Sequence, residues 1–203
     1  MPSALARLIS RLLHPAILPT LFLLIFFQIN PLAAGKLSLQ GKLFIMSILF
    51  VFTFLLPVVF VLILIKAGFV QSLEMESKEE RKLPFLATAI CFITGYYLLK
   101  EFRLSEGFNL LMLGATLSTV LASLVNYFRK ISLHMIGIGG VCGALLGLSR
   151  HTLLDLSAPI IISFLLAGVI SWARLTLKAH SQAQIYAGFL LGFLCEFVLL
   201  RLW

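Results

Sequence analysis

Seven long apolar runs limit what this chain can fold into more than any other feature of its sequence. They cover residues 16–35, 43–65, 83–100, 108–127, 131–149, 157–173 and 183–202. Each run is close to the ~17–25 residues that an α-helix needs to cross the hydrocarbon core of a bilayer. Backbone polar groups inside a bilayer must find partners within the protein, so single runs of this length are expected to be helical. The sequence therefore predicts an all-α, polytopic bundle of transmembrane helices.

Composition and gap length indicate one membrane domain. Hydrophobic residues make up 61% of the 203 residues and charged residues 12%, which is far more apolar than a soluble domain. The gaps between the runs are short, and no low-complexity tract or internal repeat divides the chain. We predict a single membrane domain over residues 1–203, in an integral membrane protein.

The N-terminal part of the chain leaves the number of spans open between six and seven. The first run contains Gln28, Asn30 and Pro31, which fit a broken or re-entrant segment as well as a full span. Ahead of it, MPSALARLISRLLHPAIL carries Arg7 and Arg11 in an amphipathic pattern and shows no signal-peptide cleavage site. We predict that this segment is an N-terminal interfacial helix at the membrane surface.

The net charge indicates which partners to expect, and the positions of the cysteines indicate whether a disulfide or a metal site is expected. The formal net charge is +8 on a chain with little polar surface, so the expected partners are membrane lipids with anionic or phosphorylated head groups, and not nucleic acid. Cys91, Cys142 and Cys195 lie in separate apolar runs, without a CxxC spacing or clustered histidines. We therefore predict neither a disulfide nor a metal site.

Three of the gaps between runs carry basic residues beside a helix start. They read QSLEMESKEERKLPF, NYFRKISLH and ARLTLKAHSQ. Consecutive members of this set are separated by two spans, so all three must lie at the same face of the membrane. Side chains from the three gaps are therefore able to share one site.

Each gap also has a purely structural interpretation. ESKEERK fits a solvated collar at the membrane edge, with Ser77 and Glu80 as a helix-capping pair. Ser132 stands where the N-cap of the fifth run belongs, and His134 fits a polar helix end. Glycines recur every four residues at 139, 143 and 147 and again at 188 and 192, a spacing that lets membrane helices approach closely. We interpret these glycines as packing positions.

The third gap carries a motif with the spacing of a known family. Arg174, five residues, His180, three residues and Gln184 resemble the third signature of the type 2 phosphatidic acid phosphatase and haloperoxidase superfamily, Ser-Arg-x5-His-x3-Asp. Ser132-Leu133-His134 is similar to the second signature, Pro-Ser-Gly-His, and KEERKLP at residues 78–84 stands where the first, Lys-x6-Arg-Pro, is expected. The resemblance covers about residues 75–190, which form the phosphatase-like core.

The resemblance implies a metal-independent lipid phosphate phosphatase that needs no cofactor. His180 is expected to attack phosphorus and form a phosphohistidine, and His134 to protonate the leaving alkoxide. The phosphate-binding residues implied by the matching segments are Arg174, Arg81, Lys78, Lys82 and Ser132. The substrate would be a phosphorylated lipid, either a phosphate or a diphosphate monoester at the bilayer surface.

One departure from the family's pattern is Gln184, which stands where the family has aspartate. At position i+4 from His180 it can accept the ring N–H and fix the tautomer, but it supplies no negative charge. In a serine protease, replacing the orienting aspartate by its amide costs about 10⁴ in turnover. Ser181-x-x-Gln184 is also a capping box, in which the glutamine side chain folds back onto the helix start. The sequence is compatible with both roles.

Two alternatives follow from these departures and from the charge balance. A catalytically weak or inactive relative, which binds anionic lipid or scaffolds a partner, is favoured by Gln184 and by the incomplete first motif. A small transporter is a third hypothesis, to which only the polar residues of the first run point.

The resemblance implies the bacterial inner membrane as the location. With seven spans, the membrane face that carries the motifs has ten basic residues and the other face has six, and an excess of basic residues marks the cytoplasmic face. Without the four proposed phosphate-binding cations the count is six on each face, so it does not decide which face carries the site.

Overall fold

The computed structural model describes residues 2–29, 37–72, 75, 77–102, 104–152 and 155–203, and all regular structure in these ranges is helical. The helices are α1 (Pro2–Leu12), α2 (Leu18–Ile29), α4 (Leu39–Phe50), α5 (Leu56–Lys66), α6 (Lys78–Lys100), α7 (Glu106–Phe128), α8 (Leu133–Leu148), α9 (Ser157–Thr176) and α10 (Gln182–Leu202). A π-helical turn, Val51–Leu55, joins α4 to α5 without a break. The prediction of an all-α bundle is confirmed.

Five helices are long and apolar enough to cross a membrane, and they identify an integral membrane protein by length and composition. They are Leu39–Lys66, Glu79–Lys100, Glu106–Phe128, Ser157–Thr176 and Gln182–Leu202. Two other apolar runs form shorter helices, Leu18–Gln28 and Leu133–Leu148. The count of six to seven spans and the interfacial position of α1 therefore stay predictions. Asn30 and Pro31 lie outside the described residues.

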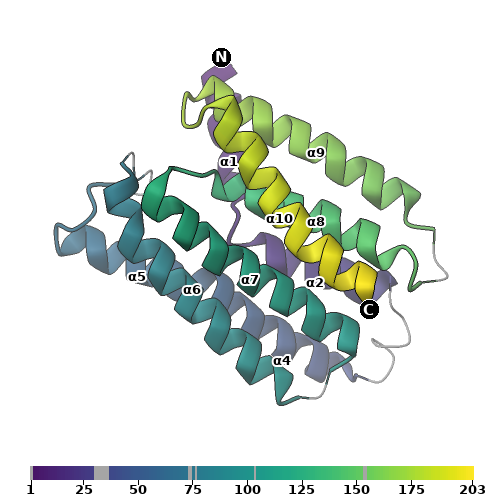
Figure 1. Ribbon diagram of the computed structural model, residues 1–203. Helices are drawn as coiled ribbons and strands as arrows, with labels where there is room; N and C mark the ends of the chain where they lie inside the picture. Colours follow the sequence, from purple (N-terminus) through teal and green to yellow (C-terminus); the bar gives the residue numbers. More distant parts are fainter. Residues whose placement is uncertain (1, 30–36, 73–74, 76, 103, 153–154) are drawn as a thin grey trace.

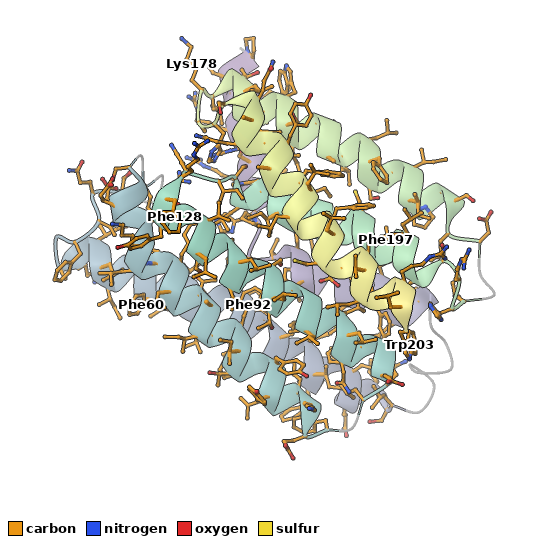
Figure 2. All side chains as sticks on the ribbon, viewed as in Figure 1. Phe60, Phe92, Phe128, Lys178, Phe197 and Trp203 are labelled. Atoms are coloured by element: carbon orange, nitrogen blue, oxygen red, sulfur yellow. The ribbon has the colours of Figure 1, made fainter. Side chains whose placement is uncertain are left out.

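The three basic gaps meet at one end of the bundle, as the crossing count predicts. The α5–α6, α7–α8 and α9–α10 connections all lie at the end where the N-terminus is drawn (Figure 1). Figure 2 shows Lys178 at this end and Trp203 at the other. α10 packs against α7 and α8, α9 packs against α8, and α1 packs against α9. These contacts bring the N-terminal helix beside the segments that carry the motifs.

The most extensive helix contact joins α8 to α10, and glycines make it possible. A Cβ at Gly192 would overlap the carbonyl of Ile136. A Cβ at Gly188 would lie 2.7 Å from the carbonyl oxygen of Ser132. Backbones this close leave no room for a larger side chain, so the predicted packing role of the glycines is confirmed. The contact fixes the start of α10 against the start of α8, where the second and third motifs lie.

We expect Gly192→Ala to lower the free energy of unfolding by ~1–3 kcal/mol, because the added methyl group meets backbone that cannot rotate away. The measurement is reversible unfolding in detergent, followed by circular dichroism. Gly168→Ala on α9 is the matched control, since no described atom lies within 4 Å of a Cβ built there. Equal stability of the two variants would contradict the close packing of α8 and α10.

Pro57 accounts for the π-helical turn in the first long helix. A proline inside a helix donates no N–H, and its ring clashes with the carbonyl four residues earlier. The wider π turn at Val51–Leu55 comes directly before it and accommodates the ring. Thr53 within the turn is fully buried and donates its hydroxyl to the carbonyl of Leu49 at 2.8 Å. Thr53 and Pro57 both face the internal cavity described next.

Candidate active site

A cavity of about 1070 Å³ lies inside the bundle and is lined by a polar and an apolar set of side chains. The polar set comes from α1 and its following turn, the start of α6, and the α7–α8 and α9–α10 gaps: Arg7, Ser10, Arg11, His14, Arg81, Lys130, His134, Arg174, Lys178 and His180. The rest of the lining lies further along the helices and is mostly apolar, including Leu18, Phe22, Phe54, Phe92, Leu111 and Ala144. It also contains the polar residues Thr53, Thr88, Ser118, Thr119 and Glu196. Among the described lining residues one, Glu196, is acidic. An anionic group attached to a hydrocarbon chain matches this division.

His180 and Gln184 form the most regular part of the polar wall. His180 is buried between α9 and α10, and its Nδ1 lies 3.0 Å from Gln184 Oε1. The same oxygen accepts the backbone N–H of Ser181 at 3.3 Å, and Ser181 Oγ accepts the backbone N–H of Gln184. Gln184 therefore orients His180 and closes a capping box at the same time. The two roles that the sequence offered as alternatives coexist.

These contacts fix the tautomer of His180. The Ser181 backbone N–H can only donate, which identifies the Gln184 atom facing both groups as the amide oxygen. An amide oxygen can only accept, so Nδ1 of His180 carries a proton and donates it. In the neutral ring, Nε2 then holds the free electron pair. His180 thus has the tautomer that a nucleophile acting through Nε2 requires.

The surroundings of His180 keep its ring neutral. Burial lowers the pKa of the imidazole to about 3, against the effect of the Gln184 hydrogen bond. The positive charges of Arg81, Arg174 and Lys130 lower the pKa in the same direction as burial. A lowered pKa means that the neutral form persists as the pH falls from 8 to about 3. The cations that lower the pKa would also attract a phosphate to the ring.

Arg81 and Arg174 hold the cationic part of the wall in place. Arg81 is buried in the first turn of α6, where Nε donates to the carbonyl of Met75 at 2.7 Å and Nη1 to that of Ile131 at 3.4 Å. Arg174, in the last turn of α9, donates from Nη1 to Ser10 Oγ at 3.4 Å. Each guanidinium is braced by a segment from elsewhere in the chain, which orients it toward the cavity.

His134 lies on the same wall but is engaged by the N-terminal helix. Its Nε2 is 3.0 Å from the carbonyl oxygen of Ser10, and its ring meets that of His14 edge-on at 5.8 Å between centroids. It interacts electrostatically with Arg174, His14 and His180. The structure therefore brings together four of the predicted site residues, His134, Arg174, His180 and Arg81, with Gln184 behind His180.

Two predicted phosphate-binding residues, Ser132 and Lys82, do not line the cavity. Ser132 is fully buried at the N-cap of α8, with no hydrogen-bond partner for Oγ among the described residues. Residues two apart at a helix start point in different directions, so the cavity receives His134 and not Ser132. Lys82 is exposed, with Nζ 4.9 Å above the ring of Tyr127, because neighbouring helix residues point about 100° apart and Arg81 takes the inward position. The Lys78 side chain lies outside the described residues.

Sequence reasoning missed the contribution of the N-terminal helix. The cavity-lining residues Arg7, Ser10, Arg11 and His14 follow the spacing i, i+3, i+4 and i+7 of one helix face. The opposite face carries the exposed leucines 5, 8 and 12. The spacing was visible in the sequence, but an amphipathic helix does not reveal whether its polar face meets water or a cavity. Lys130 and Lys178, each next to a motif, also line the wall.

Two further findings concern possible metal ligands and similarity to known proteins. Within the described ranges, no three His, Cys, Asp or Glu side chains gather in a way that could hold a metal ion. No protein-family model, curated protein or solved structure matches the chain. The arrangement of side chains around the cavity is therefore the basis for assigning a function.

Proposed function

We propose that this protein is an integral membrane lipid phosphatase, which hydrolyses a lipid phosphate or diphosphate monoester through a phosphohistidine on His180. The observation that carries the proposal is a buried, neutral imidazole with its Nε2 electron pair unprotonated, beside arginines in a cavity that continues into an apolar chamber. The resemblance of the three motifs to the type 2 phosphatidic acid phosphatases supports the same activity. The bacterial inner membrane is the location proposed with it.

The cations would bind the phosphoryl group and stabilise its transition state. Arg174 and Arg81 carry planar donor groups that match phosphate oxygens, and Lys130 adds a third charge. Phosphoryl transfer depends on positioning and on positive charge around the equatorial oxygens. Arginines that are already fixed by Ser10, Met75 and Ile131 need little reorganisation to do this.

His180 would form the covalent intermediate. Its Nε2 attacks phosphorus, and the ring becomes an imidazolium whose Nδ1–H stays bonded to Gln184. Water then attacks the phosphohistidine, and the bonding pair returns to Nε2. The resemblance assigns protonation of the leaving alkoxide to His134, and this assignment requires that the ring release the carbonyl of Ser10. The lipid chain would extend among Leu18, Phe22 and the other apolar lining side chains.

A second candidate function is binding of an anionic lipid without hydrolysis. Two observations favour it: Gln184 supplies no charge to His180, and Ser10 accepts hydrogen bonds from both Arg174 and His134. In this case the cavity would hold a lipid head group as a fixed ligand. Both functions need the arginines, and only the enzyme needs His180 to react.

The test of the proposed function is phosphate release by purified protein from phosphatidate, phosphatidylglycerol phosphate and polyprenyl diphosphate in mixed micelles containing a chelator. We expect release by the wild type and about a 10²-fold loss in Arg174→Gln, the scale of losing one transition-state donor. Lys82→Gln removes an equal charge outside the cavity and should leave release unchanged.

Two outcomes would decide against hydrolysis. Release that falls equally in Arg174→Gln and Lys82→Gln would point to general charge attraction and not to this site. No release from any of the three lipids, together with lipid binding that Arg174→Gln weakens, would establish the second candidate.

A further inference from the structure

Two histidines, His14 and His134, stand where the cavity changes from polar to apolar. The residues before His14 that line the cavity are Arg7, Ser10 and Arg11, and those that follow it as far as the end of α2 are apolar, beginning with Pro15. His134 likewise begins an apolar stretch of α8. The leaving oxygen of a lipid phosphate lies at this boundary, because it joins the phosphoryl group to the hydrocarbon. Either imidazole is therefore placed to give it a proton.

The hydrogen bonds of the two rings differ. The carbonyl of Ser10 can only accept, so Nε2 of His134 donates its proton to it and is not available to a ligand. Nδ1 of His14 accepts the backbone N–H of Ala16 at 3.4 Å, so its proton is on Nε2, away from the backbone. Because His14 lines the cavity, this N–H is the one that a leaving oxygen can meet.

We infer that His14 is the general acid of the reaction and that His134 is a positioning residue, which holds the N-terminal helix through Ser10. The inference rests on the proposed phosphatase activity. It gives the turn after α1 a catalytic role and explains why the polar face of α1 meets the cavity. It also explains why Ser10 binds both Arg174 and His134, since these contacts place His14 at the leaving oxygen.

The reacting form of His14 is the imidazolium, in which Nδ1 also carries a proton and has released the N–H of Ala16. Nε2 of His180 forms a bond to phosphorus, the P–O bond to the lipid breaks, and the released electron pair takes the Nε2 proton of this imidazolium. The products are the lipid alcohol, phosphohistidine and neutral His14. Neutral His14 then accepts a proton from the water that attacks phosphorus, which restores protonated His14 and free His180. Burial and the charge of Arg174 lower the pKa of His14, and binding of the phosphate dianion supplies the negative charge that lets the ring take up its proton.

The test compares two esters with different leaving groups. Phosphatidate releases an alkoxide, which needs a proton, whereas a nitrophenyl phosphate releases a stable anion, which does not. His14→Asn keeps an oxygen acceptor for the Ala16 N–H and removes the Nε2 donor. We expect it to lower the rate of phosphohistidine formation from phosphatidate roughly 10²-fold and from the nitrophenyl ester less than about threefold. The first step is measured by itself because His14 also acts in the hydrolysis of the phosphohistidine, which both esters share. His14→Gln is the second variant if His14→Asn does not fold.

The matched variant is His134→Gln, whose amide N–H can still donate to the Ser10 carbonyl. We expect any loss in this variant to be the same on both esters, as for a positioning residue. His151→Asn, outside the cavity and stacked on Trp203, should leave both rates unchanged. A leaving-group-dependent loss in His134→Gln, or an equal loss on both esters in His14→Asn, would overturn the assignment. Wild-type protein that hydrolyses neither ester would remove the proposed function and this inference together.

Discussion

Replacing His180 by alanine should abolish phosphate release and lower turnover by at least ~10⁴-fold. Loss of a catalytic nucleophile costs on the order of 10⁶ in turnover in a well-characterised serine hydrolase. The geometry supports His180 as the proposed nucleophile: Nδ1 is protonated and bonded to Gln184, and the unprotonated Nε2 belongs to a ring on the cavity wall. His134 has the reverse arrangement, since its Nε2 is bonded to the Ser10 carbonyl and its unprotonated nitrogen is Nδ1.

The decisive measurement is covalent capture of the phosphoryl group. Wild-type protein mixed with a ³²P-labelled lipid phosphate and quenched in base should carry an acid-labile label on the peptide that contains His180. His180→Ala should carry none, whereas His151→Ala, a histidine stacked on Trp203 outside the cavity, should be labelled like the wild type. Label on any other residue would show that the nucleophile is wrongly assigned.

The pH dependence of this capture follows from the lowered pKa of His180. Because the pKa lies at about 3, the neutral ring is fully populated at pH 8 and is still the main form at pH 5. With a nitrophenyl ester, which needs no acid, the rate of phosphohistidine formation should therefore stay level between these values. An ordinary pKa of 6.5 would lower the neutral fraction roughly thirtyfold by pH 5.

The helical bundle could be predicted because apolar runs are local signals, but hydropathy does not distinguish burial in lipid from burial in protein. The run 131–149 illustrates this limit. It was predicted as a span, yet α8 is 16 residues long and most of its side chains are buried against other helices. Its glycines bring α10 close enough to cover it. The apolar character of α8 therefore reflects protein packing as much as membrane depth.

In the candidate site, too, residues close together in the sequence could be predicted, whereas residues brought together only by folding could not. Arg174, His180 and Gln184 follow one another around a single turn, so the resemblance of their spacing to the third signature predicts that they act together. Ser10 and His14 are more than 100 residues away in sequence, and only the packing of α1 against α9 places them beside this turn. A contact between segments so far apart leaves no local pattern in the sequence from which it could be predicted.

Gln184→Glu is expected to raise turnover by about 10- to 10³-fold. Glutamate has the length of glutamine, so one carboxylate oxygen can accept both N–H groups that Gln184 Oε1 accepts now, from His180 and from Ser181. The added negative charge stabilises the imidazolium that forms when Nε2 attacks phosphorus. Charged partners of catalytic histidines have effects of this size. Stability should change little, because glutamate closes a capping box as well as glutamine does.

The length of the side chain makes this prediction specific. Gln184→Asp carries the same charge, but it is one methylene shorter, so its carboxylate lies farther from His180 and Ser181 than Gln184 Oε1 does now. We therefore expect a smaller gain in Gln184→Asp than in Gln184→Glu, although the family that the motif resembles has aspartate here. Both gains should vanish when His180→Ala is added, since the charge acts only through that ring. If neither carboxylate changes phosphate release by an active wild type, Gln184 is only the cap of α10, and His180 needs no charged partner.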